Sequence, residues 1–317
     1  MTRTIESVPF RRGRFAELPD QPRVPHPYAQ TVARIVPVAT RALGTVATHV
    51  RVYGSGPPLL LVHGLMTSSY SWRYVLEPLG ARFTLYLPDL PGNGRSAAPP
   101  GRYHPDAFVE WLGAVIDALG IRGCAVVGNS MGGYLCMRLA LRDPGAMSRL
   151  INVHSPGVPE WRLDALRALT AVPGVRSLIA AMARLAPERW AHRNVHYWDE
   201  SLKSREEARE YGAPLATADG SRAFVKHLTE IMAPGPIRAF QRELADRQAR
   251  RLTFPVPLLH LYAERDPMVP ARFGDVMAER TGAPLVRLRA ASHFAHVDNP
   301  AVFLAAALPF LTSDPPA

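Results

Sequence analysis

The stretch Gly128-Asn129-Ser130-Met131-Gly132 decides the fold of this chain. It follows the apolar run at 124–127 and precedes a helix-like run at 133–141, so we expect a strand, a sharp turn and a helix. A serine on such a turn adopts strained backbone angles and raises its hydroxyl above the sheet. The turn needs small residues two positions before and after the serine, and the two flanking glycines meet that need.

Two further candidate groups lie downstream, each in a loop after an apolar, strand-like run. Asp266 follows the run at 257–262, and His293 follows the run at 285–288. A serine hydroxyl is a poor nucleophile unless an imidazole takes its proton and a carboxylate fixes the tautomer of that imidazole. Ser130, Asp266 and His293 are therefore candidates for a nucleophile, an acid and a base.

These motifs together resemble the alpha/beta-hydrolase family over roughly residues 45–312. Besides the serine turn, the resemblance rests on His63-Gly64-Leu65-Met66, on the loops at 89–96 and 263–270, and on the histidine loop at 291–300. It implies a mostly parallel eight-stranded sheet flanked by helices, with an inserted helical cap.

The resemblance also implies a catalytic triad of Ser130, Asp266 and His293. The backbone N–H groups of Leu65 and Met131 would form the oxyanion hole, in which two donors stabilise a developing negative charge. His63 is expected to brace its loop by hydrogen bonds and not to transfer protons. No metal and no organic cofactor is implied.

The composition divides the chain into an N-terminal arm rich in proline and arginine at 1–40, an α/β core at 41–154 and 252–317, and a helical cap at 155–251. At the end of the arm, the apolar residues from Val32 to Val36 would suit a short helix, but Pro37 interrupts it.

Within the core, buried or half-buried strands are expected at 45–53, 59–62, 83–87, 124–127, 149–153, 257–262 and 285–288. Core helices are expected at 71–79, 104–119, 133–141, 272–281 and 301–311. The cap has helix-like runs at 160–171, 175–185, 201–211, 221–232 and 236–250, and no convincing strand.

The pocket is harder to predict than the triad. Candidates for substrate binding are Met66, Trp161, Trp198, His154 and Phe294, because they flank the motif loops or supply large apolar side chains from the cap. Each cap aromatic could instead pack the cap against the core.

Charge and composition exclude several other classes of protein. The formal charge of +10 comes almost wholly from arginines spread along the chain, apart from a small group at 11–14, so we expect no nucleic-acid binding. Cys124 and Cys136 are interpreted as buried packing residues. No apolar run is long enough for stable membrane insertion and no short apolar run resembles a secretory signal, so a cytoplasmic location is expected. No pattern indicates an oligomeric state.

The function expected first is hydrolysis of small apolar carboxylic esters through an acyl-enzyme intermediate. Leu65, Met66 and Phe294 suggest apolar surroundings for Ser130. The alternative is a carbon–carbon bond hydrolase of ring-fission products, or another acyl-transfer enzyme with the same triad. The elbow, which is the turn at 128–133 that carries Ser130, is similar in sequence to the elbow of that class. Those hydrolases commonly carry tryptophan where this chain has Phe294, and their diketo acid substrates need a fixed cation, for which Arg193 is a candidate.

A remote third reading is a non-catalytic ligand receptor on a hydrolase fold. Such receptors usually lose a member of the triad, whereas this chain keeps all three.

Overall fold

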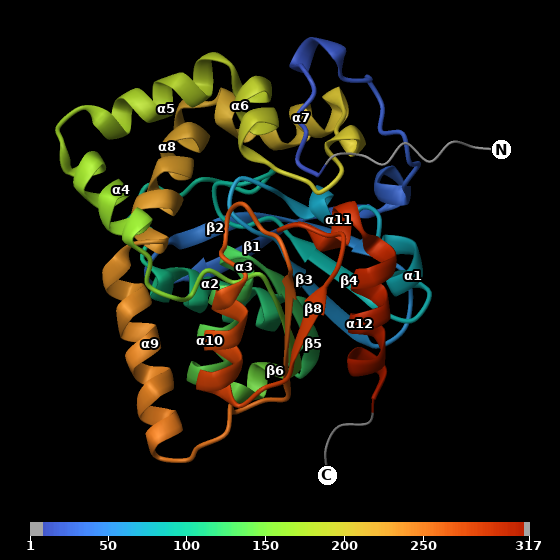
Figure 1. Ribbon diagram of the computed structural model, residues 1–317, viewed down its shortest axis with the longest axis vertical. Coiled ribbons are helices and arrows are strands. Elements are labelled where there is room, and N and C mark those ends of the chain that lie inside the picture. The colour runs from blue at the N-terminus through green and yellow to red at the C-terminus, as the bar shows by residue number, and fades with distance from the viewer. Residues whose placement is uncertain (1–8, 314–317) are drawn as a thin grey trace.

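A mostly parallel sheet of eight strands forms the centre of the computed structural model, which describes residues 9–313 (Figure 1). The strands are β1 (Val32–Thr40), β2 (Gly44–Tyr53), β3 (Pro58–Val62), β4 (Thr84–Pro88), β5 (Cys124–Asn129), β6 (Met147–Val153), β7 (Leu258–Ala263) and β8 (Leu285–Leu288). Their spatial order is β1-β2-β4-β3-β5-β6-β7-β8. The pairs β1–β2 and β2–β4 are antiparallel, and all other neighbouring pairs are parallel. The expected fold class is confirmed.

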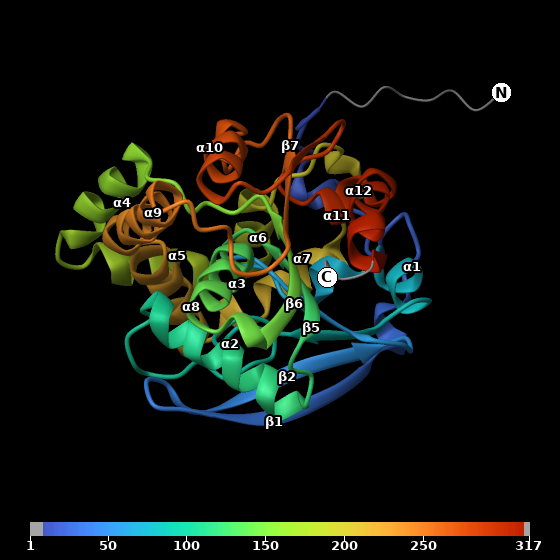
Figure 2. The same cartoon turned by 90° about the horizontal axis from the view of Figure 1, so that it is seen from below.

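Helices cover both faces of the sheet, as Figure 2 shows nearly edge-on, with α2 and α3 on one face and α1 and α12 on the other. The helices of the core are α1 (Leu76–Gly80), α2 (Pro105–Leu119), α3 (Met131–Arg142), α10 (Arg272–Thr281), α11 (Ala295–Asp298) and α12 (Pro300–Thr312). Each face has its own cluster of buried apolar side chains. Because both faces are covered, the parallel strands are mostly apolar and do not alternate.

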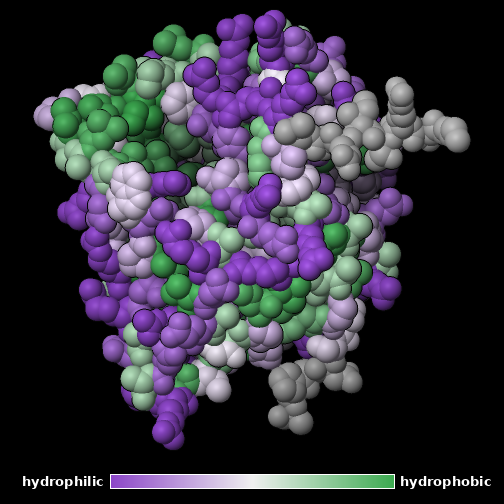
Figure 3. Space-filling model, in the orientation of Figure 1, coloured by the Kyte–Doolittle hydropathy of each residue, from purple (hydrophilic) through white to green (hydrophobic). Residues whose placement is uncertain are grey.

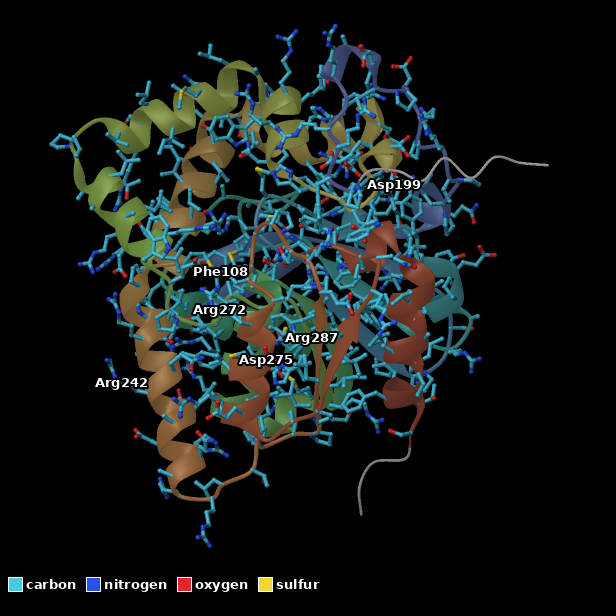
Figure 4. The ribbon with its side chains drawn as sticks, in the orientation of Figure 1. Phe108, Asp199, Arg242, Arg272, Asp275 and Arg287 are labelled. Carbon is cyan, nitrogen blue, oxygen red and sulfur yellow. The ribbon has the colours of Figure 1, made fainter. Side chains whose placement is uncertain are left out.

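Charged side chains also join the layers. Arg287 of β8 reaches Asp275 of α10, with Nη2 2.5 Å from Oδ1, and the two lie side by side in Figure 4. The same guanidinium donates to the backbone oxygen of Ala271 at 2.6 Å. These contacts fix α10 beside the loop that carries Asp266.

A helical insertion occupies the chain between β6 and β7. Its helices are α4 (Trp161–Ala171), α5 (Val175–Leu185), α6 (Pro187–Asn194), α7 (Arg205–Gly212), α8 (Ala218–Lys226) and α9 (Pro234–Ala249). Between α8 and α9 the chain forms a π-helical turn, η7 (His227–Ile231). Helix α6 was not expected. Helix α7 begins later than expected because the Ser204 side chain accepts from the N–H of Glu207 and caps it there.

The N-terminal segment differs from the sequence-based expectation. The last residues of the predicted arm form strand β1, not a short helix, and this strand pairs with β2 along its whole length. Pro37 is accepted because β1 lies at the edge of the sheet, where proline interrupts fewer backbone hydrogen bonds. Residues 1–8 of the predicted arm lie outside the described residues.

The helix expected at 71–79 is also shorter than predicted. The chain forms a 3₁₀ turn at Ser69–Trp72 and then α1. The Ser68 hydroxyl caps the first of these by accepting from the N–H of Tyr70 at 3.3 Å. In this segment the Tyr70 ring lies 5.8 Å from that of Tyr211 in the helical insertion, and Trp72 stacks on His296.

Candidate active site

Ser130 sits between β5 and α3 in a strained backbone conformation, with φ 55° and ψ −122°. Its N–H donates to the carbonyl oxygen of Val153 at 2.7 Å, which joins the turn to the next strand. A Cβ on Gly132 would collide with the backbone oxygens of Val62 and His63. The glycine is therefore required where α3 starts against β3, as the sequence pattern predicts.

Asp266 and His293 are in direct contact. Nδ1 of His293 donates to Oδ2 of Asp266 at 2.7 Å, and both side chains are buried. The other carboxylate oxygen accepts from the N–H groups of Met268 at 2.7 Å and Val269 at 2.9 Å. Burial alone would raise the pKa of Asp266, but the charge of and hydrogen bond from His293 hold it below its usual value. The carboxylate is thus kept ionised and aimed at the imidazole.

Ser130 and His293 line the same cavity, which has a volume of about 170 Å³. Its wall comes from the loops after β3, β5, β6, β7 and β8 and from the helical insertion. The residues that line it are Gly64, Leu65, Ser130, Met131, Pro156, Glu160, Arg162, Leu163, Leu228, Met232, Met268, Val269, Phe273, His293 and Phe294. A mostly apolar pocket with a few polar groups is the usual form of a small-molecule site.

Leu65 and Met131, the predicted oxyanion-hole residues, both line this cavity beside Ser130. The loop that carries Leu65 is held by His63, whose Nδ1 donates to the oxygen of Gly64 at 2.8 Å. Nε2 of the same ring accepts from the N–H of Leu90 at 2.9 Å. Burial lowers the pKa of His63, so this histidine is a neutral brace, in the role that was predicted.

Two residues that hold the histidine loop were not found from the sequence. The Asn129 side chain donates to the carbonyl oxygen of His293 at 3.0 Å, linking the elbow to that loop. Asp298 accepts from the N–H of Ser292 at 3.1 Å and from the N–H of Trp198 at 2.7 Å. Asn129 could have been found from the sequence, because it is a polar residue in an otherwise apolar strand. The sequence held no such signal for Asp298, because its partner Trp198 is remote in sequence.

Two of the predicted pocket residues lie behind the cavity wall. Met66 is buried in the core cluster on the α1 and α12 face, with a positive φ of 63°, and does not line the cavity. His154 is fully buried, with its ring centroid 5.6 Å from that of His293. Its Nε2 accepts from the N–H of Ala263 at 2.6 Å, and burial lowers its pKa to about 3. It supports His293 from behind as a neutral group.

The aromatic predictions had mixed outcomes. Phe294 lines the cavity. Trp161 does not, because it begins α4 on the outer side of the helix and is 70% exposed. Trp198 packs away from the cavity, with its ring 5.7 Å from that of Phe10. The insertion instead contributes Leu228 and Met232 to the cavity wall.

The arginine that lines the cavity is not the one predicted from the sequence. Arg193 lies on α6 and is exposed, outside the cavity lining, whereas Arg162 of α4 lines the cavity. Nε of Arg162 lies 3.7 Å from Oε1 of Glu160, which lines the cavity too. The two opposite charges leave the wall with no net charge at this point.

Residues 9–313 contain no cluster of histidine, cysteine or acidic side chains able to hold a metal ion. Cys124 and Cys136 are buried free thiols, and burial raises the pKa of Cys124 to about 12. No single helix in this range is long and apolar enough to cross a bilayer. Helices α4 and α5 reach that length and composition only together, and the chain bends by 100° between them.

Comparison with known proteins identifies the family of the chain. Residues 57–300 match the model of the alpha/beta hydrolase fold family. A 2-hydroxymuconate semialdehyde hydrolase of Pseudomonas is 28% identical, over 74% of this chain and 79% of that protein. A pimeloyl-[acyl-carrier protein] methyl ester esterase of Aeromonas salmonicida is 29% identical, over 82% of this chain and 97% of that protein.

Solved structures give the same result for the fold. An alpha/beta hydrolase fold protein of Burkholderia ambifaria superimposes with a TM-score of 0.62 at 25% identity, covering 88% of this chain and all of that one. With the family model spanning most of the sheet and the loops that carry Ser130, Asp266 and His293, the chain belongs to the alpha/beta hydrolase fold family.

Proposed function

We propose that this protein is a serine hydrolase that cleaves small apolar carboxylic esters with Ser130, His293 and Asp266. One observation carries the proposal: His293 donates to the ionised Asp266 at 2.7 Å while its ring and Ser130 line one cavity. A serine beside an oriented imidazole is the arrangement that activates a hydroxyl for attack on a carbonyl carbon.

The reaction would proceed in two halves. His293 removes the proton of the Ser130 hydroxyl as its oxygen attacks the ester carbonyl, and the carbonyl oxygen takes up the electron pair. The N–H groups of Leu65 and Met131 stabilise that oxyanion. His293 then protonates the departing alcohol, leaving an acyl-enzyme. Water repeats the sequence with His293 as base, which releases the acid and restores Ser130.

The cavity wall favours a neutral substrate. Leu163, Leu228 and Met232 supply apolar surface from the insertion, and Phe294 supplies it from the histidine loop. Each buried methylene of an acyl chain is worth about 0.8 kcal/mol. Since Arg162 is paired with Glu160, the wall offers little attraction to a free carboxylate.

Carbon–carbon bond hydrolysis is the second candidate. A relative named 2-hydroxymuconate semialdehyde hydrolase and a relative named methyl ester esterase are similarly identical to this chain, so identity does not separate the two reactions. Arg162 is the cation that a ring-fission dienoate would have to use, at the expense of its pairing with Glu160.

A fluorophosphonate probe tests the nucleophile. It should label the wild-type protein and a Ser148→Ala variant, whose serine is exposed at the start of β6, but not Ser130→Ala. Labelling of Ser130→Ala at the wild-type rate would place the nucleophile elsewhere.

The substrate class is tested separately, by measuring kcat/KM for 4-nitrophenyl butyrate and for a ring-fission dienoate under the same conditions. We expect the ester value to be at least tenfold higher. A dienoate value equal to or above the ester value would replace the esterase proposal by the second candidate.

A further inference from the structure

Helices α4 and α5 carry a group of exposed apolar side chains at the outer corner of the helical insertion. The group comprises Trp161 and Leu169 on α4, Val172 directly after α4, and Leu178, Met182 and Leu185 on α5. We call these six residues the apolar corner. Figure 3 shows hydrophobic residues gathered where Figure 1 places α4 and α5.

The apolar corner has the spacing of one helix face. Leu178, Met182 and Leu185 follow one another at intervals of four and three residues, so they lie on one side of α5. The opposite side of α5, which includes Ala180 and Ala183, is buried against the insertion. Helix α5 therefore has two apolar faces, and only one of them is covered within the protein. Leu185 is 84% exposed.

Positive charge surrounds the apolar corner. From Glu160 to Leu185 the chain has four arginines (Arg162, Arg167, Arg176 and Arg184) and two acidic residues (Glu160, which pairs with Arg162, and Asp164), a formal charge of +2. All four arginines are exposed. An apolar face with tryptophan and leucine, bordered by arginine, is the composition of helices that lie in the surface of a membrane with anionic headgroups.

The shape of the region argues for lying on a membrane and against crossing it. The 100° bend between α4 and α5 excludes a straight span of the combined length. A second copy of this chain is a poorer occupant, because pairing two such corners would bring two groups of arginines together. An anionic surface offers opposite charge and apolar depth at once.

The apolar corner is also next to the candidate active site. Arg162 and Leu163 belong to the first turn of α4, directly after Trp161, and both line the cavity. A surface bound at the corner therefore lies beside one wall of the cavity that contains Ser130.

We propose that the α4–α5 corner is a docking surface for anionic lipid membranes, on which the protein binds peripherally. Trp161 and the leucines would enter the apolar layer, while the arginines contact the headgroups. This binding is independent of the proposed esterase activity, so it should persist when Ser130 is replaced.

Co-sedimentation with vesicles of phosphatidylglycerol or of phosphatidylcholine tests the proposal, with the Ser130→Ala protein measured in parallel. We expect at least tenfold stronger partitioning to phosphatidylglycerol, weakened by salt. The triple variant Leu178→Gln, Met182→Gln, Leu185→Gln should lose at least tenfold in partitioning. The double variant Arg167→Gln, Arg184→Gln should lose most of the preference for the anionic lipid.

A matched control replaces exposed apolar residues elsewhere, with Ile35→Gln on β1 and Leu252→Gln before β7, and should bind as the wild type does. Equal binding by the triple variant and the wild type would overturn the proposal. So would equal binding to the two lipids. A dimer in sedimentation velocity that the triple variant abolishes would show that a second copy covers the corner, and would overturn it too.

Discussion

The two halves of the helical insertion are held in opposite ways. Around α6 and α7, buried charges tie the insertion to the core: Arg73 donates to Glu207 at 2.5 Å, and the Tyr197 hydroxyl donates to the same carboxylate at 2.8 Å. Around α4 and α5, the outer face has no such anchor and presents the apolar corner. The anchored half carries Trp198, whose N–H holds Asp298 in the histidine loop.

The two halves therefore differ in what they contribute to the protein. Burying a paired charge is costly, and removing one partner is more costly still, so the α6–α7 half has one well-defined position against the core. That position also fixes the loop of His293. The α4–α5 half leaves its apolar area available. Changes in or beside the anchored half should therefore cost activity or stability, and changes at the apolar corner should cost neither.

The largest effect is expected in the loop that the anchored half holds. His293→Ala should lower kcat for ester hydrolysis by about 10⁴-fold or more, because the serine loses its base. His296→Ala should keep kcat within about tenfold, since His296 is fully buried, stacks on Trp72 with ring centroids 4.2 Å apart and does not line the cavity. Steady-state kinetics on both variants would decide, and an equal loss in both would make the choice of base wrong.

The next effect concerns the buried ion pair. Arg73→Met should reduce the free energy of unfolding by about 3–5 kcal/mol, because it leaves the Glu207 carboxylate buried without its cation. Burial already raises the pKa of Glu207. The loss of unfolding free energy in Arg73→Met should therefore become smaller as pH falls and this carboxyl is protonated.

Leu185→Gln at the apolar corner is the matched comparison for that ion pair. It should change the free energy of unfolding by less than about 0.5 kcal/mol in the same urea titration. A loss at Leu185 as large as that at Arg73 would mean that the two halves are not held differently.

An effect smaller than that of the ion pair is expected at the contact between the insertion and the histidine loop. Burial raises the pKa of Asp298 to about 6. Since this is above the unfolded value of about 3.9, the carboxyl favours folding most below about pH 4, and that contribution is lost as pH rises through about 6.

Asp298→Asn removes this titration while keeping an acceptor for Trp198. Relative to the wild type, the variant should therefore gain about 2 kcal/mol of stability between pH 4.5 and pH 7. Urea unfolding at the two pH values measures the difference, with Glu243→Gln on the exposed side of α9 as control. A difference that does not vary with pH would mean that Asp298 titrates normally.

The parts predicted well from the sequence are those whose signal is local. The elbow of Ser130 and the apolar strands that follow one another in the core could be identified because glycine spacing and apolar runs depend on neighbouring residues. Asp266 and His293 could be predicted because each lies in a loop that follows such a strand and resembles a loop of the family.

The parts predicted poorly depend on contacts between distant segments. Strand β1 is stabilised by its pairing with β2, and the pattern of apolar and polar residues within β1 does not predict this pairing. Trp161 was wrongly predicted to line the pocket. The sequence does not show which face of its helix is exposed to solvent. Leu228 and Met232, which line the cavity, lie in and directly after the π-helical turn before α9. No local sequence pattern predicted this turn.

The edge position of β1 bears on how copies of this protein meet at high concentration. An uncovered edge strand offers unpaired backbone groups to the edge of another chain, which is a common start of aggregation. Along this edge Pro37 lacks an N–H and Arg34 adds an exposed charge, so a ladder of backbone hydrogen bonds to a second molecule would be interrupted. Pro37, which made this strand hard to predict from the sequence, thus also disfavours pairing of β1 with a strand of another molecule.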